Sequence, residues 1–197
     1  TNYYLQFKNK KTVLTIFEKR VNSKDLPFFM NLMDGLSKLK IVCPKPIKNR
    51  NGSYLFKIKN KKACLVTFLK GRDKKKLSQS ECRQIGKNVA ELHKATKKLK
   101  VNRKNSLSIR SLNTILSKID KRINKLSKNL KIKMRNDLEQ LVKNWPKNLP
   151  NGVIHSDLFI DNIFFYKKKF YGFIDFYFSC TDYYAYELAT CVNALCF

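Results

Sequence analysis

Residues 153–176, VIHSDLFIDNIFFYKKKFYGFIDF, are the most informative part of this 197-residue chain. A short apolar run leads into a polar loop. Two further apolar runs then flank the turn KKK, a pattern typical of a β-hairpin. The pattern predicts strands at 153–155, 163–166 and 170–175. Chemically reactive side chains are concentrated in the loop and directly after the hairpin.

Those side chains follow the spacing His155-x-Asp157-x-x-x-x-Asn162, and Asp175 lies beyond the hairpin. The spacing matches a kinase catalytic loop followed by a metal-binding aspartate. Phosphoryl transfer needs a carboxylate to orient and deprotonate the attacking hydroxyl, and oxygen ligands for Mg²⁺. We therefore predict Asp157 as the base, Asn162 and Asp175 as Mg²⁺ ligands, and His155 as a brace of the loop. A polar turn with incidental acids is the alternative, and the complete spacing argues against it.

The first 70 residues read as a small antiparallel sheet with one helix. Alternating apolar residues predict one hairpin from strands 3–8 and 12–18 and a second from strands 53–59 and 63–69. Between them, apolar residues at helical spacing predict a helix over 25–40. Ser23 is the predicted N-cap of this helix, and Pro27 is tolerated because it lies in the first turn.

The remainder of the chain is mainly helical. A polar, basic segment at 70–77 marks a boundary, and Ser78 to Glu81 form a capping box that opens a helix running to about Leu99. Residues 108–143 predict two basic amphipathic helices, and residues 184–197 a last apolar one.

Charge suggests a nucleic-acid binder at first sight, since 42 Lys and Arg against 14 Asp and Glu give +28. The basic residues are nevertheless spread over every polar face, without an RNA-binding or zinc-finger motif. We favour a lysine-rich solvated surface over a nucleic-acid interface. No apolar run is long enough to cross a membrane, and we expect no membrane partner. The chain start does not read as a signal peptide.

The six cysteines form no C-x-x-C pair, and the two histidines lie far apart in sequence. This spacing speaks against a structural zinc site and, with no histidine near a cysteine, against a catalytic thiol. We expect reduced cysteines in a cytoplasmic protein.

Several blocks together resemble the homoserine kinase branch of the aminoglycoside phosphotransferase and choline kinase superfamily. They are FEKRV at 17–21, DLPFF at 25–29, VTFLKG at 66–71, HSDLFIDN at 155–162, IDFYF at 174–178, and the tail 180–197. The resemblance covers nearly the whole chain and is weakest over 100–143.

The resemblance implies an α+β, two-lobe protein-kinase-like fold, with ATP and Mg²⁺ between the lobes. An antiparallel-sheet lobe would span 1–70, and a mainly helical lobe with the catalytic hairpin 71–197. It implies ATP-dependent phosphorylation of the L-homoserine hydroxyl, a step of threonine biosynthesis. Backbone groups near Thr67 and Leu69, with Phe68 between them, would contact adenine, although a plain buried strand explains their pattern equally well.

The sequence departs from the usual kinase pattern on the strand that normally carries a lysine, where Thr15 occupies the matching position. Lys19 or Arg20 could reach the phosphates from beyond the strand or lie at the surface. The acid that would pair with such a lysine is Asp25 or Asp34. No glycine-rich phosphate loop is visible, and we expect the chain to be a fragment lacking both ends.

Two acids near the end of the chain admit two interpretations. Asp182 and Glu187 could support the loop or bind the substrate amine. We favour structural roles, with Asp182 as a helix cap and Glu187 in a buried ion pair.

Two other functions stay open. A kinase for choline or an aminoglycoside would share the mechanism, but a polycationic aminoglycoside needs an acidic pocket, and acids are few. A basic RNA-binding protein with an inactive kinase fold is the third possibility, against which the intact motif argues.

Overall fold

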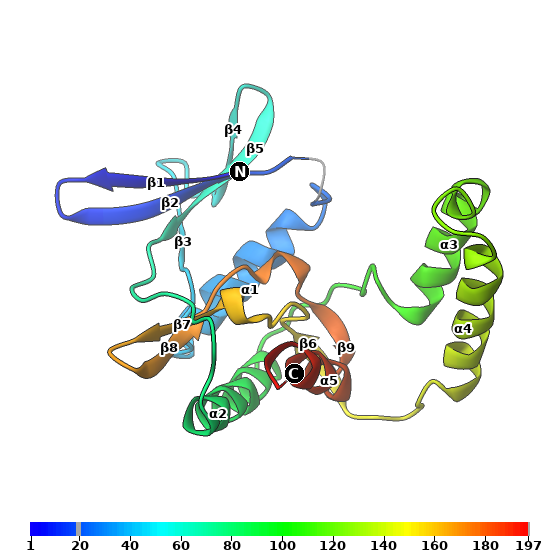
Figure 1. The fold of residues 1–197 in the computed structure, drawn as a ribbon. Coiled ribbons are helices and arrows are strands. Elements are labelled where there is room, and N and C mark those ends of the chain that lie inside the picture. The colour runs from blue at the N-terminus through cyan, green and yellow to red at the C-terminus, as the bar shows by residue number, and fades with distance from the viewer. Residues whose placement is uncertain (19–20, 197) are drawn as a thin grey trace. The chain divides into compact units, whose positions relative to one another are not determined.

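The computed structural model describes residues 1–18 and 21–196, with the side chains of 120–122 outside the description. The chain forms two compact units, one made of Thr1–Arg103 with Asn151–Phe197 and the other of Lys104–Pro150 (Figure 1). The predicted lobe boundary near residue 70 falls inside the first unit, and the division into 1–70 and 71–197 stays a prediction.

The first unit begins with an antiparallel sheet in the order β1-β2-β5-β3, and β4 also pairs with β5. Its strands are β1 (Asn2–Phe7), β2 (Lys10–Ile16), β3 (Pro46–Ile47), β4 (Leu55–Ile58) and β5 (Lys61–Thr67). Both predicted hairpins are confirmed, whereas the two-residue β3 was predicted only as extended chain. The register sets Asn2 opposite Thr15, so these side chains share one face of the sheet.

Helix α1 (Leu26–Lys38) crosses this unit and buries one face in the core. The fully or nearly buried side chains are Leu26, Phe29, Met30, Leu32, Met33 and Leu36. Pro27 lies in the first turn, as predicted, where its missing N–H costs no intrahelical hydrogen bond. The predicted cap was wrong, because Asp25 rather than Ser23 precedes the helix, and its side chain makes no capping bond.

Helix α2 (Gln79–Thr96) begins at the predicted capping box. The Ser78 hydroxyl accepts from the Glu81 N–H, while the Glu81 carboxylate accepts from the Ser78 N–H at 2.9 Å. The Lys74 ammonium pairs with the same carboxylate. The helix packs against α1, β6 and β8.

The last part of the chain returns to the first unit through short strands. These elements are β6 (Asn151–Ile154), β7 (Ile163–Tyr166), β8 (Lys169–Phe173), β9 (Cys180–Tyr183) and helix α5 (Tyr184–Leu195), with 3-10 turns at Ile160–Asn162 and Phe176–Phe178. Strands β7 and β8 form the predicted hairpin. Strand β9 was not predicted, because its four residues gain strand geometry only by pairing with β6. Asp182 lies within β9, so its predicted place as a helix cap was wrong; Tyr183 precedes α5.

The core of the first unit is continuous from the sheet to the catalytic hairpin. Phe29 and Met30 of α1 belong to the same buried cluster as Leu92 of α2 and Phe173 and Phe176. Burial of this apolar surface is the main stabilising term for the unit, and it fixes the segment that carries Asp175 against α1.

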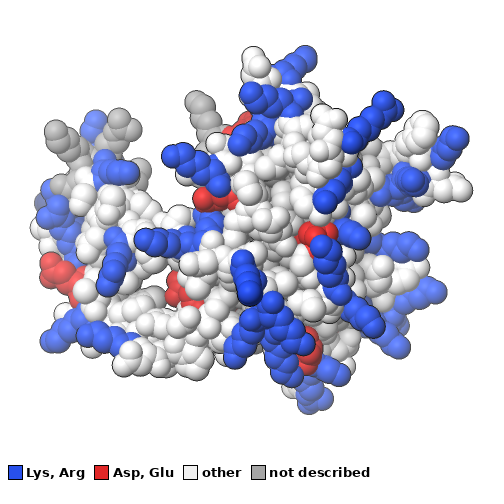
Figure 2. Space-filling view, turned by 180° about the vertical axis from the view of Figure 1, so that it is seen from behind, with Lys and Arg blue, Asp and Glu red and all other residues white. Residues whose placement is uncertain are grey.

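The second unit is a helix pair, α3 (Ile109–Ile123) and α4 (Leu130–Asn144), as predicted. Leu116, Ile123 and Leu138 form its small buried cluster. None of the helices in the described ranges is long and apolar enough to cross a membrane. Lysine and arginine side chains are scattered over the face shown in Figure 2 rather than gathered in one block.

The capping box of α2 predicts an acid-sensitive element of stability. The bond from Lys74, then those from Ser78, lower the pKa of Glu81 from 4.5 to about 2. A pKa lower in the folded than in the unfolded state means that the stabilisation is present above about pH 4.5 and is lost as the pH falls toward 2. We expect Glu81→Gln to lower the free energy of unfolding by roughly 1 kcal/mol at pH 7, and urea unfolding should show this difference shrinking between pH 4.5 and 2.

Glu91→Gln is the matched control, because Glu91 is an exposed acid on the same helix that forms a surface ion pair with Lys94 one turn away. A difference for Glu81→Gln that stays constant down to pH 2.5 or below would contradict the assignment of its low pKa.

Candidate active site

The loop after β6 is held by the first residue of its motif. His155 is 1% exposed, and its Nε2 lies 2.8 Å from the carbonyl oxygen of Ile174, while its Nδ1 accepts from the Asp157 N–H at 3.3 Å. These partners set the neutral tautomer with the proton on Nε2. The ring also packs against Phe176, with centroids 4.6 Å apart. His155 thus has the contacts of a brace, and both ring nitrogens are occupied within the protein.

The amide at the other end of the motif reaches back to the acid. Nδ2 of Asn162 donates to the Asp157 carbonyl at 2.8 Å and to Asp157 Oδ2 at 3.1 Å. Since Nδ2 makes both contacts, Oδ1 is the atom of Asn162 that can act as an oxygen ligand. The side chain is 8% exposed, so this orientation is fixed by its surroundings.

Asp175 lies beside this loop because a backbone bond ties the two segments together. The Ile174 N–H donates to the Asn162 carbonyl at 3.0 Å, one residue before Asp175. Asp175 itself adopts the left-handed conformation, with φ 59° and ψ 58°. A non-glycine residue in this region is strained, and such strain is often found at functional sites. The backbone therefore turns Asp175 away from the direction that strand β8 would give it.

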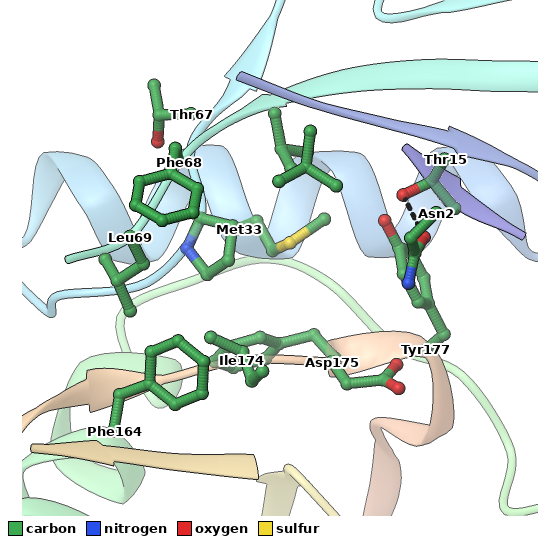
Figure 3. A pocket seen from close by; sticks show the side chains of 14 residues that line it. Asn2, Thr15, Met33, Thr67, Phe68, Leu69, Phe164, Ile174, Asp175 and Tyr177 are labelled. Carbon is green, nitrogen blue, oxygen red and sulfur yellow. Dashed lines mark hydrogen bonds between the residues drawn. The ribbon is translucent and has the colours of Figure 1, made fainter. Parts of the chain in front are cut away.

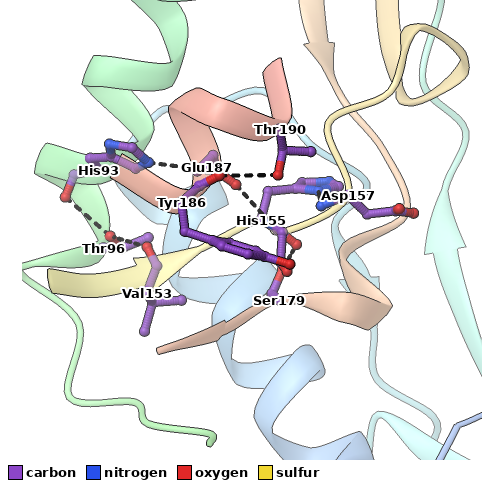
Figure 4. Close-up of polar contacts among 10 residues, drawn as sticks. His93, Thr96, Val153, His155, Asp157, Ser179, Tyr186, Glu187 and Thr190 are labelled. Atoms are coloured by element: carbon purple, nitrogen blue, oxygen red, sulfur yellow. Dashed lines mark hydrogen bonds and ion pairs between the residues drawn. The ribbon is translucent and has the colours of Figure 1, made fainter. Parts of the chain in front are cut away.

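A buried carboxylate from another element anchors the loop (Figure 4). Glu187 of α5 is fully buried; its Oε1 accepts from the Ser156 N–H at 2.7 Å, and its Oε2 lies 2.6 Å from His93 Nε2 of α2. Ser156, between His155 and Asp157, has a φ of 69°. The Glu187 contact holds this strained residue, and the predicted buried pairing of Glu187 is found, with His93 as its partner.

A cavity of about 240 Å³ lies between the sheet and the Asp175 segment (Figure 3). Most of its lining is apolar. The lining residues are Asn2, Val13, Thr15, Met33, Pro44, Val66, Thr67, Phe68, Leu69, Phe164, Ile174, Asp175, Phe176 and Tyr177. The structure thus brings the three predicted adenine-contacting residues to the same cavity as Asp175.

The backbone at the end of β5 is already partly engaged. The Thr67 N–H donates to the Lys45 carbonyl oxygen at 2.9 Å, and the Phe68 N–H donates to the Lys11 carbonyl oxygen at 3.2 Å. Of the three predicted residues, Leu69 is therefore the one whose N–H is the candidate donor to a ligand. The half-exposed Phe68 ring lies against Tyr4 at the cavity mouth, with centroids 5.3 Å apart.

Tyr177 closes the cavity at the Asp175 end. Burial raises the pKa of its phenol well above 10, so the group is neutral. Its oxygen lies 3.6 Å from Cys64 Sγ, and burial also raises the pKa of that thiol to about 11. Cys64 is consequently not a thiolate nucleophile at neutral pH.

Of the other predicted residues, Asp25, Asp34 and Asp182 do not line the cavity. Lys19 falls outside the described residues. Asp25 pairs with Arg103 at 2.7 Å and Asp34 with Lys38 at 2.6 Å, so each of these acids has a partner other than a strand lysine. Asp182 accepts from the N–H of the following residue at 2.7 Å.

Sequence reasoning missed several contributors to the site, among them Asn2, Tyr177 and His93. Asn2 lies in none of the quoted motifs, and the block 174–178 contains Tyr177 without giving it a role; the sheet register and the turn after Asp175 bring both residues to the cavity. Arg103 was also missed: besides Asp25, it donates to the Ser179 carbonyl at 3.1 Å, and so joins α1 to the segment after Asp175.

Among the described residues, no three His, Cys, Asp or Glu side chains are grouped as a metal site. All six cysteines are free thiols. The donor set that remains, one carboxylate and one amide oxygen, suits a hard cation such as Mg²⁺ that keeps several waters.

The fold is that of kinases acting on small molecules. An amicoumacin kinase solved with AMP-PNP and Ca²⁺ superposes with a TM-score of 0.66 at 15% identity, covering 95% of this chain and 62% of that one. A microcompartment-associated aminopropanol kinase gives 0.64 at 14% identity, covering 97% and 65%. Such likeness shows a shared kinase-like fold.

The chain belongs to the phosphotransferase enzyme family, whose sequence profile matches residues 1–197. Curated relatives are the homoserine kinases of Methylobacterium radiotolerans and Rhizobium etli, each 40% identical over all 197 residues. That of Methylobacterium sp. (strain 4-46) is 41% identical. The chain spans 61% of the length of each of these relatives.

The Glu187 anchor leads to a prediction about stability. Glu187→Ala leaves the Ser156 N–H and His93 buried without their acceptor, and should lower the free energy of unfolding by about 2–5 kcal/mol in urea titrations. Glu187→Gln should lose less, because its amide can still accept from Ser156 and donate to a neutral imidazole.

Glu91→Ala serves as the control, since Glu91 is half-exposed and forms a surface ion pair with Lys94. It should change stability by less than about 0.5 kcal/mol. Equal stability of the Glu187→Ala and Glu91→Ala variants would show that Glu187 does not anchor the loop.

Proposed function

We propose that the protein transfers the γ-phosphoryl group of ATP to the hydroxyl of L-homoserine, forming O-phosphohomoserine for threonine biosynthesis. The observation that carries this proposal is the identity of about 40% to homoserine kinases over all 197 residues. The loop geometry supports the same class of chemistry. Substrate and activity are proposed for the whole protein, because this chain spans 61% of the length of its relative.

Asp157 is the proposed base. Its carboxylate receives the Asn162 amide hydrogen and is held by a loop braced at His155 and Glu187, so its position is defined before substrate binds. From there it can orient the homoserine hydroxyl and accept its proton as the oxygen attacks phosphorus. His155 acts through loop position, because its two ring nitrogens are engaged.

The proposed Mg²⁺ ligands are Oδ1 of Asn162 and the carboxylate of Asp175. Both are hard oxygen donors, and the backbone bond between Ile174 and Asn162 keeps their segments adjacent. Bound Mg²⁺ would neutralise phosphate charge and favour in-line transfer. The protein's own contribution is to hold these two oxygen donors beside the base.

The apolar cavity is the proposed adenine site. Val13, Val66 and Ile174 line its walls, and Leu69 supplies the candidate N–H donor, with Thr67 and Phe68 on the same strand end. ATP would thus bind between the proposed lobes 1–70 and 71–197. We also propose that Lys19, which lies outside the described residues, contacts the phosphates of ATP.

Asp182 and Glu187 are proposed to support the site rather than touch substrate. Glu187 is fully buried and both its oxygens are engaged, which leaves no acceptor for a substrate amine. Free thiols at all six cysteines support a cytoplasmic protein.

Two alternative functions each have an observation in their favour. Solved proteins with a similar fold include an amicoumacin kinase and an aminopropanol kinase, so another small alcohol is the alternative acceptor. The net charge of +28 would attract RNA as well as ATP. Its scattered distribution in Figure 2 favours general attraction of anions over a defined nucleic-acid surface.

The test is ADP release by the protein expressed from its complete open reading frame, with homoserine, choline and an aminoglycoside in parallel. We expect turnover with homoserine only. Asp157→Asn should lower kcat by roughly 10²–10⁴-fold, because the amide cannot accept the hydroxyl proton.

Asp161→Asn is the matched control, an exposed acid in the same loop. It should retain wild-type turnover. Turnover with another alcohol alone would discard homoserine, and wild-type activity in Asp157→Asn would discard Asp157 as the base.

A further inference from the structure

The Asp175 end of the cavity has a polar pair from the sheet. Asn2 and Thr15 stand opposite each other on β1 and β2, and Thr15 Oγ1 donates to Asn2 Oδ1 at 2.8 Å. Thr15 is 8% exposed, so its hydroxyl is fixed by the sheet. In Figure 3 both side chains lie at the end of the cavity occupied by Asp175 and Tyr177.

The hydrogen bond determines what Asn2 can offer a ligand. With Oδ1 engaged by Thr15, the carboxamide turns its nitrogen, Nδ2, toward the Tyr177 side of the cavity (Figure 3). Nδ2 carries two N–H donors, and within the described part of the chain neither of them makes a hydrogen bond, so both are available at this exposed residue. A cavity end with free amide donors suits an acceptor-rich group.

The charges of the lining residues limit which acceptor-rich ligand group can bind at this end of the cavity. Asp175 is the one charged side chain among the described residues around the cavity. A bare carboxylate repels phosphate, but a Mg²⁺ ion held there would reverse the sign locally. The adjacent neutral amide can then contact phosphate oxygens without a cationic side chain.

By its place in the sequence pattern, Thr15 matches the strand position at which protein kinases carry the lysine that contacts the phosphates. The Thr15 hydroxyl donates to Asn2 Oδ1, so Thr15 acts by orienting the Asn2 carboxamide. The neighbouring Asn2, one strand over, is the group that reaches the space left by the shorter side chain.

We propose that the Asn2 carboxamide, oriented by Thr15, binds the phosphate chain of the nucleotide in place of the usual strand lysine. This inference rests on the proposed function only for its ligand, a nucleoside di- or triphosphate. It assigns Asn2 a direct contact with the nucleotide and Thr15 an indirect one.

The test compares nucleotides with and without phosphates, by calorimetric titration of the full-length protein with Mg-ATP, Mg-ADP and adenosine. Asn2→Ala should weaken ATP and ADP binding about 10–100-fold, the loss of a hydrogen bond to a charged group. Adenosine affinity should stay within about twofold. Asn2→Asp, which keeps the shape but replaces donors by a negative charge, should weaken ADP binding further.

Thr15→Val tests the positioning role and should weaken ATP and ADP binding less than Asn2→Ala, again sparing adenosine. Gln6→Ala and Thr12→Val are the matched controls, a carboxamide on β1 and a threonine on β2 that lie outside the cavity lining. Both should bind all three ligands as the wild type does. Urea unfolding of each variant separates lost contacts from lost structure.

Three results would overturn the inference, and one of them would also reject the proposed function. Unchanged ATP affinity in Asn2→Ala, with homoserine turnover intact in the wild type, rejects the Asn2 contact alone. Equal losses for adenosine and ATP would assign Asn2 a role in sheet structure. A folded wild type that binds none of the nucleotides rejects the proposed function as well.

Discussion

The site depends on a backbone that is held in strained conformations on both sides of the catalytic hairpin. Ser156 and Asp175 have φ values of 69° and 59°, in a region that side chains other than glycine disfavour. Two hydrogen bonds offset this cost: Glu187 accepts from the Ser156 N–H, and Asn162 accepts from the Ile174 N–H. The two bonds thus tie the loop to α5 and the Asp175 segment to the residue that ends the motif.

These bonds are strong because the surrounding core excludes water. Glu187 and His155 are almost completely buried, and Phe173 and Phe176 pack in the same cluster as α1 and α2. A charge or a polar group in such a place is stable only with its partners in position. The core therefore specifies the loop geometry, and the connection through Arg103 extends that order to the start of α1.

Electrostatics acts at two distances in this protein. The excess of 28 positive charges attracts anions from solution, and this attraction is spread over the surface. Within the cavity the described lining is mostly apolar and includes one acid, so binding there depends on shape, on a metal ion and on oriented dipoles. Long-range attraction would raise the rate of encounter, whereas the cavity would choose the ligand.

Local pattern was sufficient for much of the fold. The hairpins, the capping box at Ser78 and the helix pair over 108–143 are set by alternation, helical spacing and turn residues, which act between close neighbours. Short elements were missed, as in β9, whose strand geometry comes from pairing with β6. Ser23 was misassigned because a capping residue is chosen by where the chain enters the helix, which packing decides.

Within the site, the residue types and spacing of the His155 to Asn162 motif and the acid at Asp175 could be read from the sequence. The pairs that meet across the fold could not: His93 with Glu187, Arg103 with Asp25, and Asn2 with Thr15. The physical reason is that a motif within one loop is fixed by local backbone geometry. Contacts between residues 13 to 94 positions apart depend instead on sheet register and on the burial of a shared core.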